Sequence, residues 1–450
     1  MRKINPIPAL MLNSCYFYIM KTWLPLLISI MLFAATGCKQ DRNGVEAPSV
    51  TVSEPLAGRT FNFSDTISVK ADISHQQSIS SIQVAMINEF STPVLPVQTF
   101  YPAANHFSLV TFMVIDDRFL ESGSYSIRIK TMVDGEVFNR WVKINYNSEP
   151  LNLESLLVLT RSQGSVYRLL NVLPGDIVQE RFSFSGDYRG SALISGYRLF
   201  FSAGSVMNNL TAWNLENNAV SWSVPSVPDP PLPYFNAIYS DGNEVYVSTR
   251  DALVKGYNRS GGNTFRSVQF PNGYFTSLLR HKTWLMAVFE PFNSEFNKLL
   301  AFNYPGGTVF RSIPFKGTVA GMTDFGEDGV LLFMNGEAGS AVYQYSFDLN
   351  TLINLKDFPQ GNILDLTAPD TDNAFIAFAD GIYWYRPDIA SVVKVLPDQS
   401  VADLVFDALS GSLFVASGKT VSRYKVPSFV PEESYTMTDS ITDIHLLYNK

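Results

Sequence analysis

The last 300 or so residues repeat one short pattern seven times, and this repetition limits the possible folds more than any other feature of the chain. Each copy has an apolar first strand, an apolar second strand and a third strand that usually ends in an aromatic residue. A period near 40 residues, with about four short strands per unit and Gly, Asp or Asn turns between them, is typical of propeller blades. The sequence therefore predicts a seven-bladed β-propeller. Equivalent first-strand residues, 38 to 45 positions apart, are Leu193, Ile238, Leu278, Met322, Leu366, Leu404 and Ile444.

The first repeat lacks an innermost strand of its own. It begins at Leu156 to Leu159, whereas the end of the chain, Ile441 to Leu446, matches the innermost-strand pattern and is followed by no further strand. An open ring would leave a strand edge with free backbone N–H and C=O groups. We therefore expect the C-terminal strand to pair into the first blade and close the ring.

Residues 50–147 follow a different pattern, without the 40-residue period. Six or seven strand-like segments in about 100 residues, with Thr66 to Val69 and Ile82 to Met86 as separate strands, predict a β-sandwich. The segment Leu120-Glu121-Ser122-Gly123-Ser124-Tyr125, followed by Ile127 and Ile129, resembles the tyrosine corner of fibronectin type III and related immunoglobulin-like domains. The resemblance implies an all-β chain in which an immunoglobulin-like β-sandwich (50–147) precedes the propeller (148–450).

Residues 1–37 have the composition of an export signal. The apolar run from Trp23 to Ala35 follows Lys21 and is too short to span a bilayer. The residues before Met20 lack signal character, so Met20 is a candidate for the true start. Ala35-Thr36-Gly37-Cys38 resembles the lipobox of bacterial lipoproteins, which implies that Cys38 is lipidated and becomes the mature N-terminus. An ordinary signal peptide with an incidental cysteine is the alternative.

Lipidation would make a membrane the first partner of the chain. The only other cysteine, Cys15, lies in the leader, so Cys38 has no intramolecular disulfide partner. Two acyl chains would anchor the protein stably through the polar tether 38–49. By resemblance to Gram-negative lipoproteins, Lys39 in place of aspartate implies the outer membrane, on its periplasmic or cell-surface side. With 33 basic and 41 acidic residues, a net charge of −8, the chain is not expected to bind nucleic acid.

The sequence contains no motif for catalysis, metal binding or nucleotide binding. The four histidines are not at helical or hairpin spacing from one another, which argues against a histidine metal centre. No Gly-x-Ser-x-Gly elbow, Walker loop or His-Glu-x-x-His motif occurs. We therefore expect no metal, no cofactor and no catalytic residue.

Three aspartates occupy one equivalent position of the innermost strands, namely Asp365, Asp403 and Asp443 in blades six, seven and one. Innermost strands line the central channel, so three adjacent carboxylates could bind a cation or a basic ligand group. Alternatively, each carboxylate accepts hydrogen bonds from the backbone of the next blade and fixes the spacing of the blades. Paired carboxylates could also perform glycosidase chemistry, which requires separations of about 5 to 10 Å.

Two unusual loops are expected on one face of the ring. In a meander, the second-to-third hairpins and the blade-to-blade connections emerge together where the first strand begins. The proline-rich connection 224–234 and the blade-four hairpin 289–296 both belong to this face. Phe289, Phe292 and Phe296 could stack on sugar rings or anchor a protein partner. They could equally fold back over the edge of blade four.

The whole plan resembles lipid-anchored surface proteins of Gram-negative bacteria in which an immunoglobulin-like module precedes a propeller. Val401-Ala402-Asp403-Leu404 and Leu413-Phe414-Val415-Ala416 are similar to propeller repeats of the YVTN and NHL type. The resemblance implies a non-catalytic cell-surface lipoprotein that binds a glycan or a protein partner through one propeller face. Two alternatives stay open: a glycoside hydrolase or lyase that uses the channel-mouth carboxylates, and an architectural spacer of an outer-membrane complex.

Overall fold

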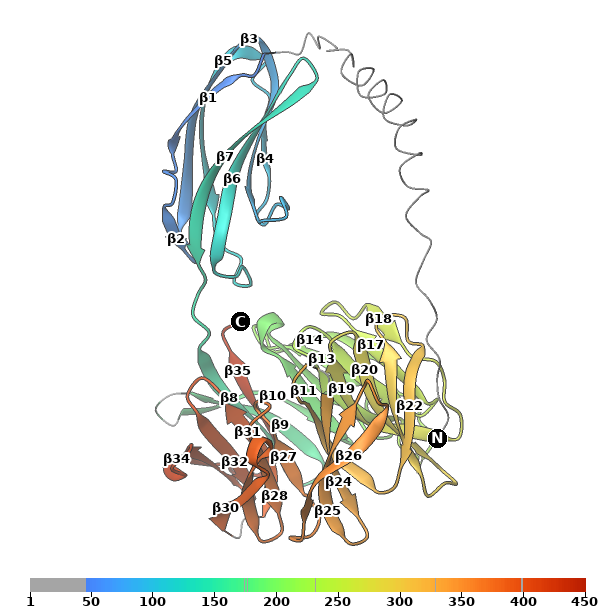
Figure 1. Ribbon diagram of the computed structural model, residues 1–450. Helices are drawn as coiled ribbons and strands as arrows, with labels where there is room; N and C mark the ends of the chain where they lie inside the picture. The colour runs from blue at the N-terminus through green and yellow to red at the C-terminus, as the bar shows by residue number, and fades with distance from the viewer. Residues whose placement is uncertain (1–45, 174, 176, 231, 328, 398–399) are drawn as a thin grey trace, which may run out of the picture. The chain divides into compact units, whose positions relative to one another are not determined.

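The computed structural model describes residues 46–173, 175, 177–230, 232–327, 329–397 and 400–450. The chain divides into two compact units, the first ending at Glu149 and the second running from Pro150 to Lys450. Regular structure in the described residues is β-strand apart from two 3-10 helices, η1 (Ser195–Tyr197) and η2 (Pro387–Ile389) (Figure 1). The expected export signal and Cys38 lie outside the described residues.

Seven antiparallel sheets of four strands each make up the second unit, and each sheet is one blade that extends from an innermost to an outermost strand. In that order, blade one contains β35 (Ser440–Tyr448), β8 (Leu153–Arg161), β9 (Val166–Leu173) and β10 (Ile177–Ser185). Blade two contains β11 (Gly190–Ile194), β12 (Leu199–Ala203), β13 (Leu210–Asn214) and β14 (Ala219–Val224). Blade three contains β15 (Phe235–Ser240), β16 (Val245–Thr249), β17 (Leu253–Tyr257) and β18 (Asn263–Arg266). Blade four contains β19 (Gly273–His281), β20 (Trp284–Pro291), β21 (Asn297–Asn303) and β22 (Val309–Phe315).

The remaining three blades follow the same order. Blade five contains β23 (Thr318–Asp324), β24 (Gly329–Gly336), β25 (Gly339–Ser346) and β26 (Thr351–Phe358). Blade six contains β27 (Asp365–Thr367), β28 (Ala374–Phe378), β29 (Gly381–Arg386) and β30 (Ser391–Pro397). Blade seven contains β31 (Val401–Asp407), β32 (Ser412–Ser417), β33 (Thr420–Lys425) and β34 (Val430–Thr436).

The C-terminal strand closes this ring. β35 lies antiparallel to β8 as the innermost strand of blade one, with Ile444 opposite Val158. Each innermost strand also contacts the innermost strand of the next blade, and β35 contacts both β31 and β11. The prediction of a seven-bladed propeller closed by the C-terminal strand is therefore confirmed.

Apolar strands packed between neighbouring blades form the core of the ring. The second strands β16 and β28 are buried along their whole length, because each blade is covered on both faces by its neighbours. At the seam of the ring, Val421 of blade seven packs with Val158 and Ile444 of blade one. Ring closure therefore buries the same kind of apolar interface as every other blade pair.

The first unit is built on one long strand. Its strands are β1 (Ser49–Glu54), β2 (Thr60–Asn62), β3 (Thr66–Ile87), β4 (Gln98–Phe100), β5 (Ala104–Val114), β6 (Gly123–Val133) and β7 (Glu136–Asn147). They pair in the order β1-β3-β6-β7-β2, and β4 and β5 also pair with β3.

The expectation of two separate strands at 66–69 and 82–86 is wrong, because β3 spans both in 22 continuous residues. Residues 72–81 contain no glycine or proline that would end the strand. The strand instead shifts register between Ser74 and Ile79, so its first half pairs with β1 and β5 and its second half with β6 and β4.

The tyrosine singled out in the sequence lies near the start of β6. Its hydroxyl, Tyr125 Oη, donates a hydrogen bond of 2.8 Å to the carbonyl oxygen of Glu121. The ring packs edge-on against Tyr146 and borders the buried core of the unit. The bond fixes the turn that leads into β6.

Candidate functional site

Second-to-third hairpins and blade-to-blade connections meet on one face of the ring, which we call the connection face. In blade four, the hairpin residue Phe292 donates its backbone N–H to Asn272 in the connection ahead of β19. In blade two, Ser226 of the proline-rich connection donates its hydroxyl to the carbonyl of Met207 in the β12–β13 hairpin, at 2.7 Å. Both unusual loops therefore lie on the face where the up-and-down course of a meander predicts them.

The three phenylalanines of the blade-four hairpin do not form one surface. Phe289 is only 3% exposed and packs against Phe270 and Phe275, so its burial favours the alternative in which the hairpin aromatics fold back onto blade four over a role in ligand contact. Phe292 and Phe296 are 57% and 48% exposed. The Phe292 ring lies against Tyr274 and the Phe296 ring lies 5.0 Å from Lys316 Nζ. Only these two are available to a ligand.

The proline-rich connection folds onto blade three. Arg250 Nη2 donates to the carbonyl of Val227, and its guanidinium forms an ion pair with Asp229. Tyr234, at the end of the connection, is buried against Phe235. This loop is held by the ring, which favours a covering role for it.

A groove of about 1220 Å³ opens on the connection face beside blade five. Its walls are the β24–β25 hairpin around Glu337, the connection at Lys316 that precedes β23, and the connection at Asn362 that precedes β27. Glu295 of the blade-four hairpin reaches its rim and pairs with Lys316 at 3.2 Å. The groove therefore adjoins the exposed Phe296 and Lys316 pair.

Side-chain hydrogen bonds hold the walls of this groove in place. Asn335 exchanges two bonds with the backbone of Ile363, and Ser340 donates to the carbonyl of Gly361 at 2.7 Å. Asn297 donates to the carbonyl of Gly317 at 2.8 Å. The two connections that join blades four, five and six are therefore fixed before any ligand arrives.

The chemistry of the groove is polar and acidic over an apolar floor. Glu295, Glu337 and Asp357 contribute three exposed carboxylates against the single ammonium of Lys316. Met334 and Tyr343 add apolar surface to the lining. Such a lining can accept hydrogen bonds from hydroxyl or amine groups and disfavours an anionic ligand.

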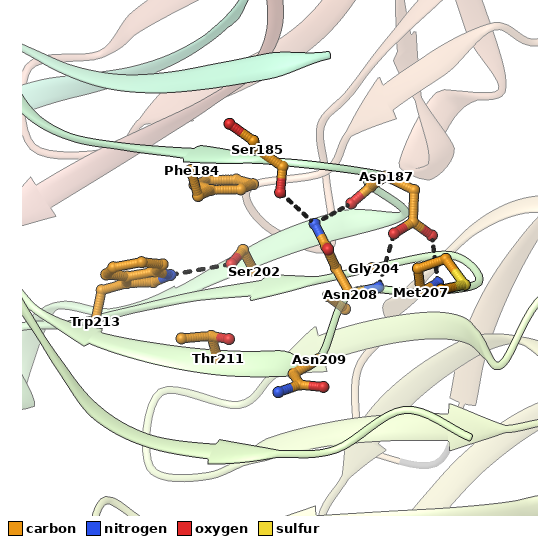
Figure 2. A pocket seen from close by; sticks show the side chains of 11 residues that line it. Phe184, Ser185, Asp187, Ser202, Gly204, Met207, Asn208, Asn209, Thr211 and Trp213 are labelled. Carbon is orange, nitrogen blue, oxygen red and sulfur yellow. Dashed lines mark hydrogen bonds between the residues drawn. The ribbon is translucent and has the colours of Figure 1, made fainter. Parts of the chain in front are cut away.

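A second hollow, of about 280 Å³, lies on the same face between blades one and two (Figure 2). Its own side chains occupy its hydrogen-bonding groups. The Asp187 carboxylate accepts the backbone N–H groups of Val206, Met207 and Asn208, and the Asn208 amide donates to the carbonyls of Ser185 and Asp187. Burial by itself raises the pKa of Asp187, but the three amides outweigh it and hold the pKa below its usual value. This hollow locks two blades together and offers little to a ligand.

Two of the three aspartates of the innermost strands bind the next blade. Asp403 Oδ2 accepts the backbone N–H of Ile444 at 2.6 Å. Asp443 Oδ2 accepts the hydroxyl of Tyr188 at 2.7 Å and also that of Ser191. The backbone N–H of Leu404 donates to Asp403 Oδ1 at 2.8 Å, and Asp365 Oδ2 is buried in the described structure without a hydrogen-bond partner. The contacts of Asp403 and Asp443 support the interpretation that these two carboxylates fix blade spacing.

The three carboxyl groups also bind one another and share protons. Burial, followed by repulsion from Asp443 and Asp365, raises the pKa of Asp403 well above its usual value. Burial likewise raises the pKa of Asp365 to about 6. Burial alone would also raise the pKa of Asp443, but His445 and hydrogen bonds from Asp403, Ser191 and Tyr188 lower it. These opposite shifts favour the protonated form of Asp403 beside the ionised form of Asp443, with a hydrogen bond from Asp403 toward Asp443.

Ser191, His445 and Asp443 are the residue types of a hydrolase triad, but their connections differ from one. His445 Nε2 lies 2.8 Å from Ser191 Oγ, as a general base would. Asp443, however, accepts from the Ser191 hydroxyl and lies 3.7 Å from the same His445 Nε2. In a triad the carboxylate holds the other ring nitrogen and leaves the serine hydroxyl to the histidine. The cluster therefore binds blade one to blade two and does not activate a nucleophile.

The sequence pattern does not indicate that Asp443 has Tyr188, Ser191 and His445 as partners. The only local signal is that His445 lies two residues after Asp443 on one strand, which puts both on the same face. Within the described residues, no cluster of His, Cys, Asp or Glu is arranged to hold a metal ion. No helix in the same part of the chain has the length and apolar character needed to cross a bilayer.

No protein family and no curated protein matches the chain. Among solved structures, it is similar to the computationally designed Ika8 protein, with a TM-score of 0.47, 9% identity, and coverage of 65% of this chain and 90% of that one. It is also similar to a quinonprotein alcohol dehydrogenase-like protein from Bacteroides thetaiotaomicron, with a TM-score of 0.46, 10% identity, and coverage of 89% and 99%. A chain of the nidogen/laminin complex gives a TM-score of 0.43 at 9% identity, with coverage of 66% and 99%. Likenesses at this level carry no statement about activity.

Proposed function

We propose that this protein is a non-catalytic binding protein whose propeller holds a neutral glycan in the blade-five groove of the connection face. The observation that carries the proposal is the groove itself, of about 1220 Å³, with walls fixed by hydrogen bonds. Pockets for small molecules usually measure about 300 to 1000 Å³, so this groove suits a chain of several sugar rings.

The lining favours sugar hydroxyls over charged groups. Carboxylates at Glu337 and Asp357 and the amide of Asn362 can accept or donate hydrogen bonds to hydroxyls, and the Tyr343 ring can pack against a sugar face. An acidic glycan would meet three carboxylates and one lysine. Its binding there is therefore disfavoured by repulsion.

The aspartate cluster gives the glycosidase alternative little support. Glycosidases keep their two carboxyl groups about 5 to 9.5 Å apart, so that a sugar or a water fits between them. Asp403 instead interacts directly with Asp443 and Asp365, and Asp403 and Asp443 also accept hydrogen bonds from the next blade. Catalysis would require these carboxylates to give up the hydrogen bonds that hold neighbouring blades together.

The first unit is proposed to be an immunoglobulin-like spacer on a lipid anchor at Cys38, at the outer membrane. Its strand pairing supports this, since one group of strands (β1, the first half of β3, and β5) and another (the second half of β3 with β4, β6, β7 and β2) enclose one core. The Tyr125 to Glu121 hydrogen bond is the contact a tyrosine corner makes. Cys38→Ser should abolish incorporation of labelled palmitate and release the protein from membranes, and unchanged labelling would reject the anchor.

The binding proposal is tested with an array of neutral and acidic glycans. A neutral glycan that binds the full-length protein should lose most of its affinity with Glu337→Gln combined with Asn362→Ala, at an unchanged melting temperature. Glu216→Gln, an exposed acid in the β13–β14 turn on the opposite face, is the control and should bind normally. Unchanged binding by the double variant would reject this groove. Binding to no glycan, with copurification of a larger assembly, would favour the architectural role.

A further inference from the structure

The first unit carries an exposed tryptophan in the middle of a regular strand. Trp141 lies on β7 and is 54% exposed, although neighbouring residues in the core-facing register, such as Val142 and Ile144, are buried. An exposed indole ring presents a large, flat apolar face to solvent, and the residues around it decide what that face can bind.

Three cations surround this tryptophan on the same face of the sheet. Arg128 of β6 lies directly opposite Trp141, and Lys130 and Lys143 lie two positions along their strands from Arg128 and Trp141. Side chains two apart on a strand, and side chains directly opposite in a pair, point to the same face. Strands β6 and β7 lie side by side in the first unit (Figure 1).

No acid balances these cations. The outward positions of β6, β7 and the second half of β3 contain no aspartate or glutamate. In the described part of the chain, the side chains of Arg128, Lys130 and Lys143 form no ion pair, and Arg128 Nε has no hydrogen-bond acceptor. Residues 46–149 nevertheless hold 11 acidic and seven basic residues. The first unit therefore has a net negative charge, yet three cations without ion pairs lie around the Trp141 ring.

We propose that this face, defined by Arg128, Lys130, Trp141 and Lys143, binds an acidic polysaccharide. The Trp141 ring offers a flat apolar surface to a sugar face, while the guanidinium and the two ammonium groups pair with carboxylate or sulfate groups on neighbouring sugars. The charge selects an anionic ligand and the ring selects one with flat, partly apolar units. The proposal is independent of the propeller groove, whose charge has the opposite sign.

The test measures binding of the full-length protein to polygalacturonate and chondroitin sulfate, with dextran as the neutral polymer. Both acidic polymers should bind, and dextran should not. Trp141→Ala should weaken binding about tenfold, which is the effect expected for losing one aromatic contact. Trp141→Phe should recover part of the loss, because a ring is restored. Added salt should weaken binding of the wild type, since the paired charges are partly exposed.

A charge control separates this face from a general effect of net charge. Lys130→Gln with Lys143→Gln should weaken binding about tenfold, whereas Lys70→Gln with Lys419→Gln, which removes the same charge elsewhere, should change it less than about twofold. Equal losses in the two double variants would overturn the proposal. So would failure of the wild type to bind either acidic polymer, or binding only to vesicles that contain phosphatidylglycerol. Melting temperatures identify any variant that fails to fold.

Discussion

Replacing Asp365 by asparagine should make the propeller more stable at neutral pH, against the usual expectation for a buried hydrogen-bonded acid. Burial raises the pKa of Asp365 from 3.8 to about 6. Because the folded state holds the proton more tightly, the stability that this group contributes is complete below 3.8 and is lost as the pH rises through about 6. A difference of about two pKa units corresponds to about 3 kcal/mol.

Asparagine cannot ionise, so Asp365→Asn removes this loss of stability at a buried position of nearly the same size. The variant should exceed the wild type by up to about 3 kcal/mol at neutral pH and match it at roughly pH 3.5. Urea unfolding followed by tryptophan fluorescence at a series of pH values measures this difference. Asp348→Asn, at an exposed position in the same ring, should show no such pH dependence. A variant that is less stable than the wild type at neutral pH would refute the raised pKa of Asp365. So would a difference in unfolding free energy that does not change with pH.

Three further outcomes follow from the packing. Deleting residues 440–450 removes β35 and exposes the edge of β8, so the protein should aggregate or melt at a much lower temperature; a soluble variant with unchanged melting would contradict ring closure. Phe289→Ala should lower the free energy of unfolding in urea by about 3 to 5 kcal/mol, whereas Phe292→Ala should change it by no more than about 0.5 kcal/mol. Equal losses for the two variants would contradict their different burial. Tyr125→Phe should cost the first unit about 1 kcal/mol, and no measurable loss would show that the bond to Glu121 does not stabilise it.

The ring could be predicted from the sequence because every blade is buried between two neighbours in the same way. Each second strand must be apolar on both faces, so the pattern returns with a regular spacing that can be counted. Ring closure was predictable from the same repeat, because the first repeat, which begins at Leu156, has no innermost strand and the C-terminal strand around Ile444 is followed by no further strands. The up-and-down course of a meander was enough to predict that the second-to-third hairpins and the blade-to-blade connections lie on one face.

The site was harder to predict because its contacts join distant parts of the chain. Ser191 and Asp443 are 252 residues apart and meet only when the ring closes. Phe289 shows a different limit, because it continues the apolar run of β20 and its ring fills the space beside Gly273, where a Cβ would lie 2.4 Å from it. Its burial depends on a glycine in the paired strand, which local composition does not reveal. The groove depends on the arrangement of four loops, which no repeat encodes.

The pairing of β35 with β8 closes the ring that carries the connection face. Hydrogen–deuterium exchange of the full-length protein, read on peptides that cover residues 440–448, tests this pairing directly. We expect these amides to exchange as slowly as those of β8 and β9, because they share one hydrogen-bonded sheet. Exchange of the 440–448 peptides within seconds, while β8 and β9 stay protected, would contradict the closed seven-bladed ring.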